Sequence, residues 1–483
     1  MPVNPLERQK NLQKANPPVE QKNAYQELYG LRENPFPSMA LFSPNINDPR
    51  RNGEIYDAEF RKEEEKQFFK MFIQPDNGDR PTQLGFIRLD PQAGGRGNGK
   101  SAFLHRIMQR INGQDWEGEW VTNVDDPNLF CLGVHVLPEP KKQKRIWEFA
   151  RLVFETMSEQ KLFAEIDKQL RAAILINLLA PEQMTELGSL PADELDKSLS
   201  NTNEFSALLE KYGHTVPGFV DMVKSQVEKI QPATNLFLAN FFENECSLIV
   251  TWGEWSRNGM LGSDYKWRKE GVEWLTNGLV PIMLVAGYRR LIILLDEFEK
   301  IYISQNARER DEFLDGLRQY FFERDSVAVK YQYITTVLTI HPSIYTYVGT
   351  NWRRVGLDNL APLDVDRIQN VSVELGASDE AKLEHLLLTY LDFFRINADD
   401  PKKGSIYPFA DDALAPAIEA ARFYPRGTLW YAYELLQKAA KDEIPAPISR
   451  GFVEEFLQGG VKPPQDEDDV FFSLPPAASD LTA

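Results

Sequence analysis

The stretch GGRGNGKS, Gly94 to Ser101, decides the fold that this sequence predicts. It satisfies G-x-x-x-x-G-K-[ST], the pattern of a loop whose backbone N–H groups surround a polyphosphate. The apolar run LGFIRLDP (84–91) precedes it and predicts a strand, and AFLHRIMQRI (102–111) follows it with apolar residues at helical spacing. Strand, glycine loop and helix are the context that the pattern requires, so a chance glycine-rich turn is the weaker interpretation.

The residues of this loop divide by chemical role. Lys100 would reach the outer phosphates, and the Ser101 hydroxyl would ligate Mg²⁺. The start of the following helix would add the positive end of its dipole. The remaining positions expected to contact the nucleotide are Gly94, Gly95, Arg96, Gly97, Asn98, Gly99 and Ala102. The sequence therefore predicts ATP and Mg²⁺ as ligands.

A second apolar run, LIILLDEFEK (291–300), predicts a central buried strand with Asp296 and Glu297 at its carboxyl end. Ligands of open α/β sheets bind at that edge. We expect Asp296 to hold Mg²⁺, directly or through water. Glu297 would orient or deprotonate the water that attacks the γ-phosphate. Taken alone, the same letters also fit an ordinary strand that ends in a charged turn.

Polar residues end the next predicted strand, YITTVLTIHP (333–342). Thr339 and His341 are candidates to contact the γ-phosphate or the attacking water. His341 fits equally well as a turn histidine before Pro342.

Three arginines further along the chain are candidates for contact with phosphate. Arg353 and Arg354 would reach the γ-phosphate held by a neighbouring subunit, because a guanidinium matches phosphate oxygens in a fork. A surface pair that holds local carboxylates is the alternative for each of them. Arg426, beside Pro425 at the start of a C-terminal helix, would contact the nucleotide from above.

The composition limits the classes of partner. The 483 residues carry a formal net charge of −18, and 42% of them are hydrophobic, enough for a sizeable core. Contacts with nucleic-acid phosphates need clustered Lys and Arg, so this acidity argues against a surface that binds nucleic acid throughout. Two clusters, KKQKR (141–145) and YKWRK (265–269), are either local basic patches or ordinary solvated faces.

Other features of the composition predict a cytoplasmic protein. Cys131 and Cys246 stand far apart in apolar surroundings, which predicts buried thiols in a reducing compartment. The first residues lack the charged-then-apolar pattern of a secretory signal. The longest apolar run, near Leu279, is too short to cross a bilayer. We therefore expect no contact with a membrane.

The order of these features resembles the AAA+ superfamily of P-loop ATPases: phosphate loop, acidic strand, polar strand end, arginine pair, and proline–arginine in a helical lid. The segment YGLRENPFP (29–37) is similar to the one before the core in initiator-like and transposition-regulator-like members and in related secretion ATPases, where it packs beside the adenine. The resemblance covers about 29–441, apart from 158–277. It implies ATP hydrolysis by a homo-oligomeric ring or filament.

Strands that alternate with helices predict an α/β fold with a parallel sheet covered on both faces. The predicted organisation is a P-loop AAA+ core with a large helical insertion and a C-terminal helical lid, in which 378–441 is wholly helical and NLAPLDVDRI (359–368) leads into the lid. The expected divisions are an N-terminal arm with the adenine-side segment (1–50), the core (51–375, with its insertion at about 158–277), the lid (376–445) and an acidic flexible tail (446–483).

Two features depart from that family. About 190 residues separate Ser101 from Asp296, which requires a helical insertion of about 120 residues, and an insertion of this size is usually a partner-binding or regulatory module. The roughly 40 residues after Lys441 are too few for a winged-helix DNA-binding domain. This favours a branch that acts in mobile elements or anti-phage defence.

Two functional hypotheses follow. The first is an ATPase that assembles with ATP and recruits or loads a protein effector on nucleic acid. The alternative is an ATP-gated signalling or scaffold protein whose helical insertion binds a protein partner without nucleic acid. The tail segment QDEDDVFFSLPP (465–476) would either dock on such a partner or serve as a disordered solubilising tail.

Overall fold

The computed structural model describes residues 23–39, 41–43, 46–57, 59–75, 80–89, 99–113, 130–139, 142–257, 264–341, 345–364 and 366–463. The chain divides into two compact units. One comprises Arg61–Gly376, and in the other Met1–Phe60 joins Ala377–Ala483. The predicted tail segment 465–476 lies outside the described residues.

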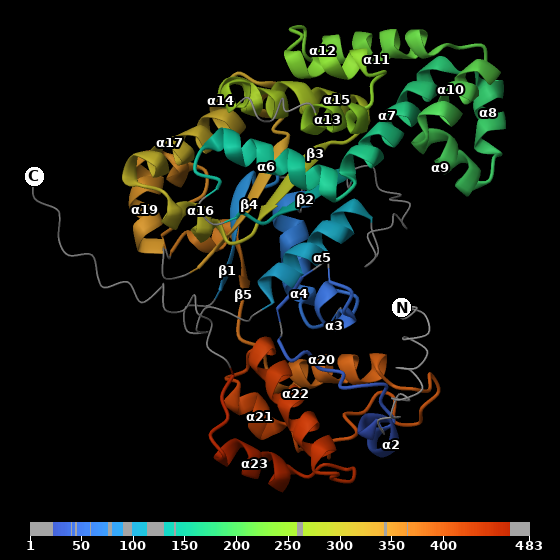
Figure 1. Ribbon diagram of the computed structural model, residues 1–483. Coiled ribbons are helices and arrows are strands. Elements are labelled where there is room, and N and C mark those ends of the chain that lie inside the picture. Colours follow the sequence, from blue (N-terminus) through green and yellow to red (C-terminus); the bar gives the residue numbers. More distant parts are fainter. Residues whose placement is uncertain are drawn as a thin grey trace, which may run out of the picture. The chain divides into compact units, whose positions relative to one another are not determined.

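A five-stranded, all-parallel sheet forms the centre of the first unit (Figure 1). Its order is β2-β3-β4-β1-β5, so β4 lies between the strand that precedes the glycine loop and the strand that carries the acidic pair. The strands are β1 (Leu84–Leu89), β2 (Cys131–Val136), β3 (Arg290–Leu295), β4 (Ile334–Ile340) and β5 (Ser372–Leu375). The predicted α/β class and parallel sheet are confirmed.

Several predicted boundaries differ from the structure. The strand expected over 291–300 ends at Leu295, because Glu297 turns the chain and helix α16 (Phe298–Ser304) begins directly after it. The strand β5, which has four residues and lies at the edge of the sheet, was not predicted from the sequence. The stretch 359–368, expected to lead into the lid, still belongs to the unit of the sheet and precedes β5.

Helices cover both faces of the sheet. On one face, α5 packs with a π-helical turn, Phe69–Ile73, over Ile87, Ile292 and Val337. On the other face, the ring of Trp352 lies 5.6 Å from that of Phe86. The helices of this layer and its connections are α4 (Lys62–Phe68), α5 (Lys100–Asn112), α6 (Ile146–Glu159), α16, α17 (Ala307–Arg318), α18 (Val327–Lys330) and α19 (Tyr345–Arg354).

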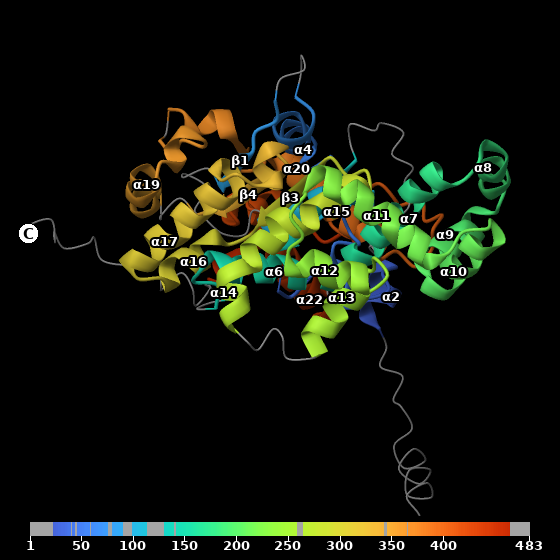
Figure 2. The ribbon, with the colours of Figure 1, turned by 90° about the horizontal axis from the view of Figure 1, so that it is seen from above.

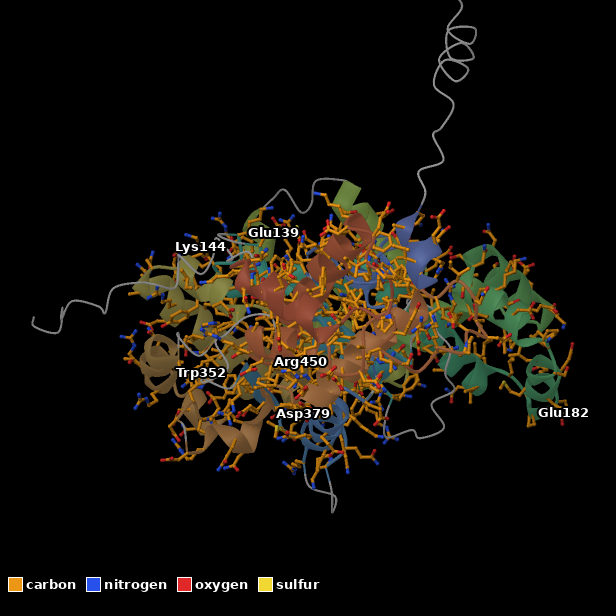
Figure 3. All side chains as sticks on the ribbon, turned by 90° about the horizontal axis from the view of Figure 1, so that it is seen from below. Glu139, Lys144, Glu182, Trp352, Asp379 and Arg450 are labelled. Atoms are coloured by element: carbon orange, nitrogen blue, oxygen red, sulfur yellow. The ribbon has the colours of Figure 1, made fainter. Side chains whose placement is uncertain are left out.

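The described chain between α6 and β3 consists of helices joined by turns. In Figures 1 and 2, α8, α9 and α10 gather at one end of α7, away from the strands, and Glu182 near the start of α8 marks this outer end in Figure 3. The helices of this insertion are α7 (Leu162–Leu178), α8 (Pro181–Gly188), α9 (Ala192–Ser200), α10 (Thr202–Lys211), α11 (Val216–Ile230), α12 (Leu236–Glu243), α13 (Leu248–Arg257), α14 (Asp264–Glu273) and α15 (Val280–Val285).

The second unit combines the N-terminal segment with the C-terminal helices. Tyr29, Leu31 and Phe36 are buried in one core with residues of α20 and α22, and the Tyr29 hydroxyl donates to the carbonyl of Ile444 at 2.9 Å. The prediction of a wholly helical 378–441 is wrong, because 394–414 lacks helix. The helices are α2 (Ala24–Tyr29), α3 (Pro49–Asn52), α20 (Glu380–Phe393), α21 (Ala415–Ala420), α22 (Pro425–Lys441) and α23 (Arg450–Gln458).

Two other predictions concern cysteine and membranes. Cys131 and Cys246 are both buried free thiols, as predicted, and burial raises the pKa of Cys131 to about 11. Among the described helices, none combines the length and apolar composition that a membrane span requires.

Two glycines on the same face of the sheet allow a test of its packing. A Cβ added to Gly85 would stand 2.5 Å from both the Phe72 ring and the Val371 carbonyl, whereas one added to Gly133 would meet its nearest atoms, on Met108 and Ile111, at 3.4 Å. We expect Gly85→Ala to lower the free energy of unfolding by about 1–3 kcal/mol through overpacking. Gly133→Ala is the matched control, and equal urea denaturation midpoints for the two variants would contradict this account.

Candidate active site at the carboxyl edge of the sheet

The register of the strands brings three predicted site residues together. Leu295 of β3 is paired with Leu338 of β4, so Asp296 and Thr339 are the next residues along two neighbouring strands. Thr339 is also paired with Ile87 of β1, the strand that runs toward the glycine loop. Ser101, in the first turn of α5, completes the group. Residues 195 positions apart in the chain thus meet at one edge.

Asp296 is the centre of this group. Its side chain is fully buried. The Ser101 hydroxyl donates to Oδ2 at 2.5 Å, and the Thr339 hydroxyl donates to Oδ1 at 2.9 Å. The backbone N–H of Glu297 also donates to Oδ1, at 2.9 Å. Both carboxylate oxygens therefore accept hydrogen bonds, as a buried charge requires.

The surrounding groups keep this carboxyl ionised. Burial alone would raise the pKa of Asp296. His135, Lys100 and the Ser101 hydroxyl outweigh burial and hold the pKa well below its usual range. The site therefore presents a carboxylate throughout the physiological range of pH.

Glu297 adopts an unusual backbone conformation. Its φ of 49° and ψ of 47° lie in the left-handed region, which residues other than glycine rarely occupy. Its N–H bonds to both Asp296 and the Thr339 hydroxyl, the latter at 2.6 Å, and these bonds stabilise the turn. The side chain is 28% exposed and forms an ion pair with Lys300. The turn therefore buries Asp296 and leaves the adjacent carboxylate accessible to water.

The start of α5 has the features of an anion site. Gly99 caps the helix with a φ of 78°, and no side chain among the described residues caps the first turn, an arrangement that presents first-turn N–H groups to a ligand. Lys100 is partly exposed and lowers the pKa of Asp296 by its charge. The pKa of Glu299, a buried residue, is raised mainly by burial, and the charge of Lys100 lowers it in part. Gly94 to Asn98 lie outside the described residues.

The donor set fits a hard divalent cation. A hydroxyl and a carboxylate that are already in contact are the oxygen ligands that Mg²⁺ prefers. In the described part of the chain, no cluster of three or more His, Cys, Asp or Glu side chains offers another metal site. Ser101 and Asp296 are thus the residues that would hold Mg²⁺, in company with phosphate oxygens.

The remaining predicted residues belong to several elements of the chain. His341 is the first residue after β4 and is partly exposed, and Ala102 is in the first turn of α5. Arg354 is ion-paired with Asp311 of α17, which also accepts a hydrogen bond from Asn351. Arg353 is exposed and donates to the carbonyl of Gly349 on its own helix at 3.2 Å. Arg426 belongs to the other unit, at the second residue of α22.

The basic cluster at 141–145 is largely neutralised by acids. Lys142 pairs with Glu139, whereas Lys144 and Arg145 pair with Glu309. Arg268 of the second cluster lies over the ring of Trp147. For the described side chains, the interpretation of these clusters as ordinary surface is therefore favoured.

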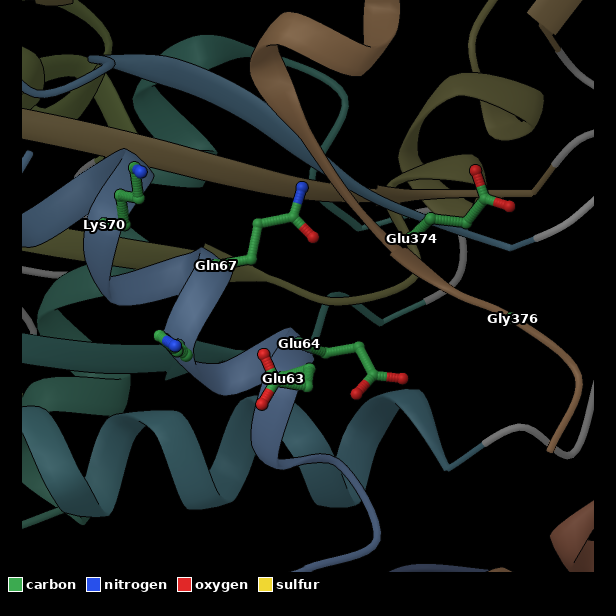
Figure 4. Close-up of a pocket in the computed structure, with 7 residues that line it drawn as sticks. Glu63, Glu64, Gln67, Lys70, Glu374 and Gly376 are labelled. Atoms are coloured by element: carbon green, nitrogen blue, oxygen red, sulfur yellow. The ribbon is translucent and has the colours of Figure 1, made fainter. Parts of the chain in front are cut away.

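A separate hollow lies between α4 and β5 (Figure 4). Its lining carries both charges, with three carboxylates (Glu63, Glu64 and Glu374) and two ammonium groups (Lys66 and Lys70). Gln67 points toward the strand and donates to the carbonyl of Ser372 at 3.3 Å. None of the predicted site residues lines this hollow, and its mixed charge does not select phosphate.

Two threonines of β4 test the role of the Asp296 contacts. Thr339 and Thr336 are both fully buried, but the Thr336 hydroxyl has no hydrogen-bond partner among the described residues. Thr339→Val should destabilise the sheet by about 1–3 kcal/mol, since it removes a donor to a buried charge, whereas Thr336→Val should be neutral or stabilising. Hydrogen exchange of the β3 and β4 amides measures both effects. Equal losses of protection would show that the Asp296 network contributes nothing specific.

The chain has also been compared with known proteins. No protein-family model, curated protein or solved structure matches it. What this site binds must therefore be inferred from its own residues and geometry.

Proposed function

We propose that the chain binds Mg²⁺ and ATP at the carboxyl edge of its sheet and hydrolyses ATP to ADP and phosphate. The observation that carries the proposal is the contact between Ser101, the last residue of the glycine-loop pattern, and the buried carboxylate of Asp296. A serine hydroxyl from the loop and an aspartate from a neighbouring strand are the paired ligands that a magnesium–triphosphate complex needs.

Each residue has a distinct task in this chemistry. Lys100 and the first-turn N–H groups of α5 offset the charge of the outer phosphates. Bound Mg²⁺ would neutralise charge on the phosphate oxygens. Glu297, held by its left-handed turn beside Asp296, orients the attacking water and accepts its proton. Thr339 maintains that turn through its bond to the Glu297 N–H.

Substitutions of Lys100 and Glu297 separate binding from turnover. Lys100→Ala should abolish nucleotide binding in isothermal titration calorimetry, because the outer phosphates lose their cation. Glu297→Gln should keep binding and lower the rate of phosphate release by about 100-fold or more, because the amide cannot accept the proton.

Two exposed residues of α11, Lys224 and Glu228, supply matched controls in the same chain. Lys224→Ala and Glu228→Gln should leave both measurements unchanged. Undiminished binding by Lys100→Ala, or full turnover by Glu297→Gln, would contradict the assigned roles.

The proposed enzyme assembles as a homo-oligomer in which an arginine completes the neighbouring site. Arg354 is engaged by Asp311 within its own subunit, and that carboxylate is anchored further by Asn351 and, through it, by the Tyr302 hydroxyl. Arg353 has an exposed side chain that bonds to the Gly349 carbonyl of its own helix. This difference favours Arg353 as the residue that acts in trans.

Mixing two inactive variants tests action in trans. Arg353→Ala should lose roughly 10³-fold in turnover and keep ATP binding, because an arginine that stabilises the transferring phosphoryl group contributes about this much. A mixture with Lys100→Ala should recover activity, since the Arg353→Ala subunit supplies an intact loop and its neighbour supplies the arginine. Arg354→Ala is the control, expected to lower stability more than turnover. A mixture as inactive as its components would overturn the assignment.

The purpose of the ATP cycle is a separate proposal. Recruitment or loading of an effector on nucleic acid agrees with the resemblance of residues 29–37 to the segment before the core in initiator-like and transposition-regulator-like ATPases. A protein partner that binds the insertion in an ATP-gated manner is favoured by the ion-paired state of Lys142, Lys144 and Arg145. It is also favoured by exposed apolar side chains of α7 and α13, namely Ile176 (64%), Ile249 (49%) and Val250 (39%).

A further inference from the structure

His135 of β2 is a buried histidine beside the Asp296 carboxylate. Its side chain is 8% exposed, and Nε2 lies 3.7 Å from Oδ2 of Asp296. Within the part of the chain that the structure describes, Nε2 has no hydrogen-bond partner. A buried polar group left unpaired loses its hydrogen bonds to water and gains none in return. An imidazole that served only to fill space would therefore be a poor choice at this position.

Neighbouring elements hold the backbone of His135. His135 is paired with Leu294 of β3 in the sheet, two residues before Asp296. The side-chain amide of Gln160, which follows α6, donates to the His135 carbonyl at 2.8 Å and accepts from its N–H at 3.4 Å. On the other side, the ring of His105 from α5 has its centroid 6.2 Å away. The backbone of His135 is therefore held by β3 and by Gln160, and its ring has that of His105 as a neighbour.

Two donors face the same oxygen of Asp296. The Ser101 hydroxyl is at hydrogen-bond distance from Oδ2, at 2.5 Å, whereas His135 Nε2 at 3.7 Å is just beyond that range. A carboxylate opposite Nε2 favours the tautomer with the proton on this nitrogen. A shift of about 1 Å would bring Nε2–H into hydrogen-bond range of Oδ2.

We propose that His135 is a positioning residue for Asp296, whose Nε2–H takes over Oδ2 when the Ser101 hydroxyl engages the bound metal–nucleotide complex. This inference rests on the proposed function. It assigns a role outside the glycine loop and the acidic pair, to a residue that contacts a metal ligand and does not itself touch substrate. Residues that orient a metal ligand in this way typically contribute 10- to 100-fold in metal affinity.

The test is a Mg²⁺ titration of the full chain with a fluorescent, non-hydrolysable ATP analogue. His135→Leu should raise the Mg²⁺ concentration for half-maximal binding by about 10-fold or more, and binding in EDTA should not change. His135→Gln, which retains a donor near the place of Nε2, should restore the Mg²⁺ dependence to within about threefold. His105→Leu is the matched control, because it removes a neighbouring imidazole. It should bind the analogue with the same Mg²⁺ dependence as the unsubstituted chain.

The possible failures are distinguishable. An unchanged Mg²⁺ dependence in His135→Leu would overturn the role of His135 and leave the proposed function intact. If His135→Leu and His135→Gln weakened Mg²⁺-dependent binding to the same extent and lowered the melting temperature equally, His135 would be a packing residue only. Absence of Mg²⁺-dependent binding in the unsubstituted chain would overturn the proposed function itself, and this inference with it.

Discussion

The structure depends on one constraint: the carboxylate of Asp296 is ionised and has no access to solvent. Removing such a charge from water costs several kcal/mol unless donors replace the lost hydration. Three come from different places in the chain, namely the Ser101 hydroxyl, the Thr339 hydroxyl and the Glu297 N–H. Each must arrive within a few tenths of an ångström, so the requirement fixes the register of β3 against β4 and the placement of α5.

The strand order follows from the same requirement. Because β4 lies between β1 and β3, Thr339 stands between the strand that leads to the glycine loop and the strand that ends at Asp296. The left-handed turn at Glu297 then separates two adjacent acids, one buried and one accessible.

The sequence predicted those parts of the site where an apolar run stops at a polar residue. This signal identified Asp296, Glu297 and Thr339, because the chain changes there from apolar to polar within one residue, whereas Ser101 was identified by the glycine-loop pattern. It could not identify His135, which sits inside the apolar run of β2 and differs from a core residue only through its neighbours in space. The strand β5 was missed because four residues show too little periodicity, and the core around Tyr29 was unpredictable since it depends on segments about 350 to 430 positions away.

The attachment of the helical insertion has a consequence for how such a chain diverges. The insertion follows α6, the helix that comes after β2, and leads back to β3, and these two strands are immediate neighbours. Its two ends are therefore anchored side by side, so residues can be gained, lost or exchanged within it without altering the pairing of any strand. A change of length or sequence in this region therefore leaves the contacts around Asp296 at the edge of the sheet in place.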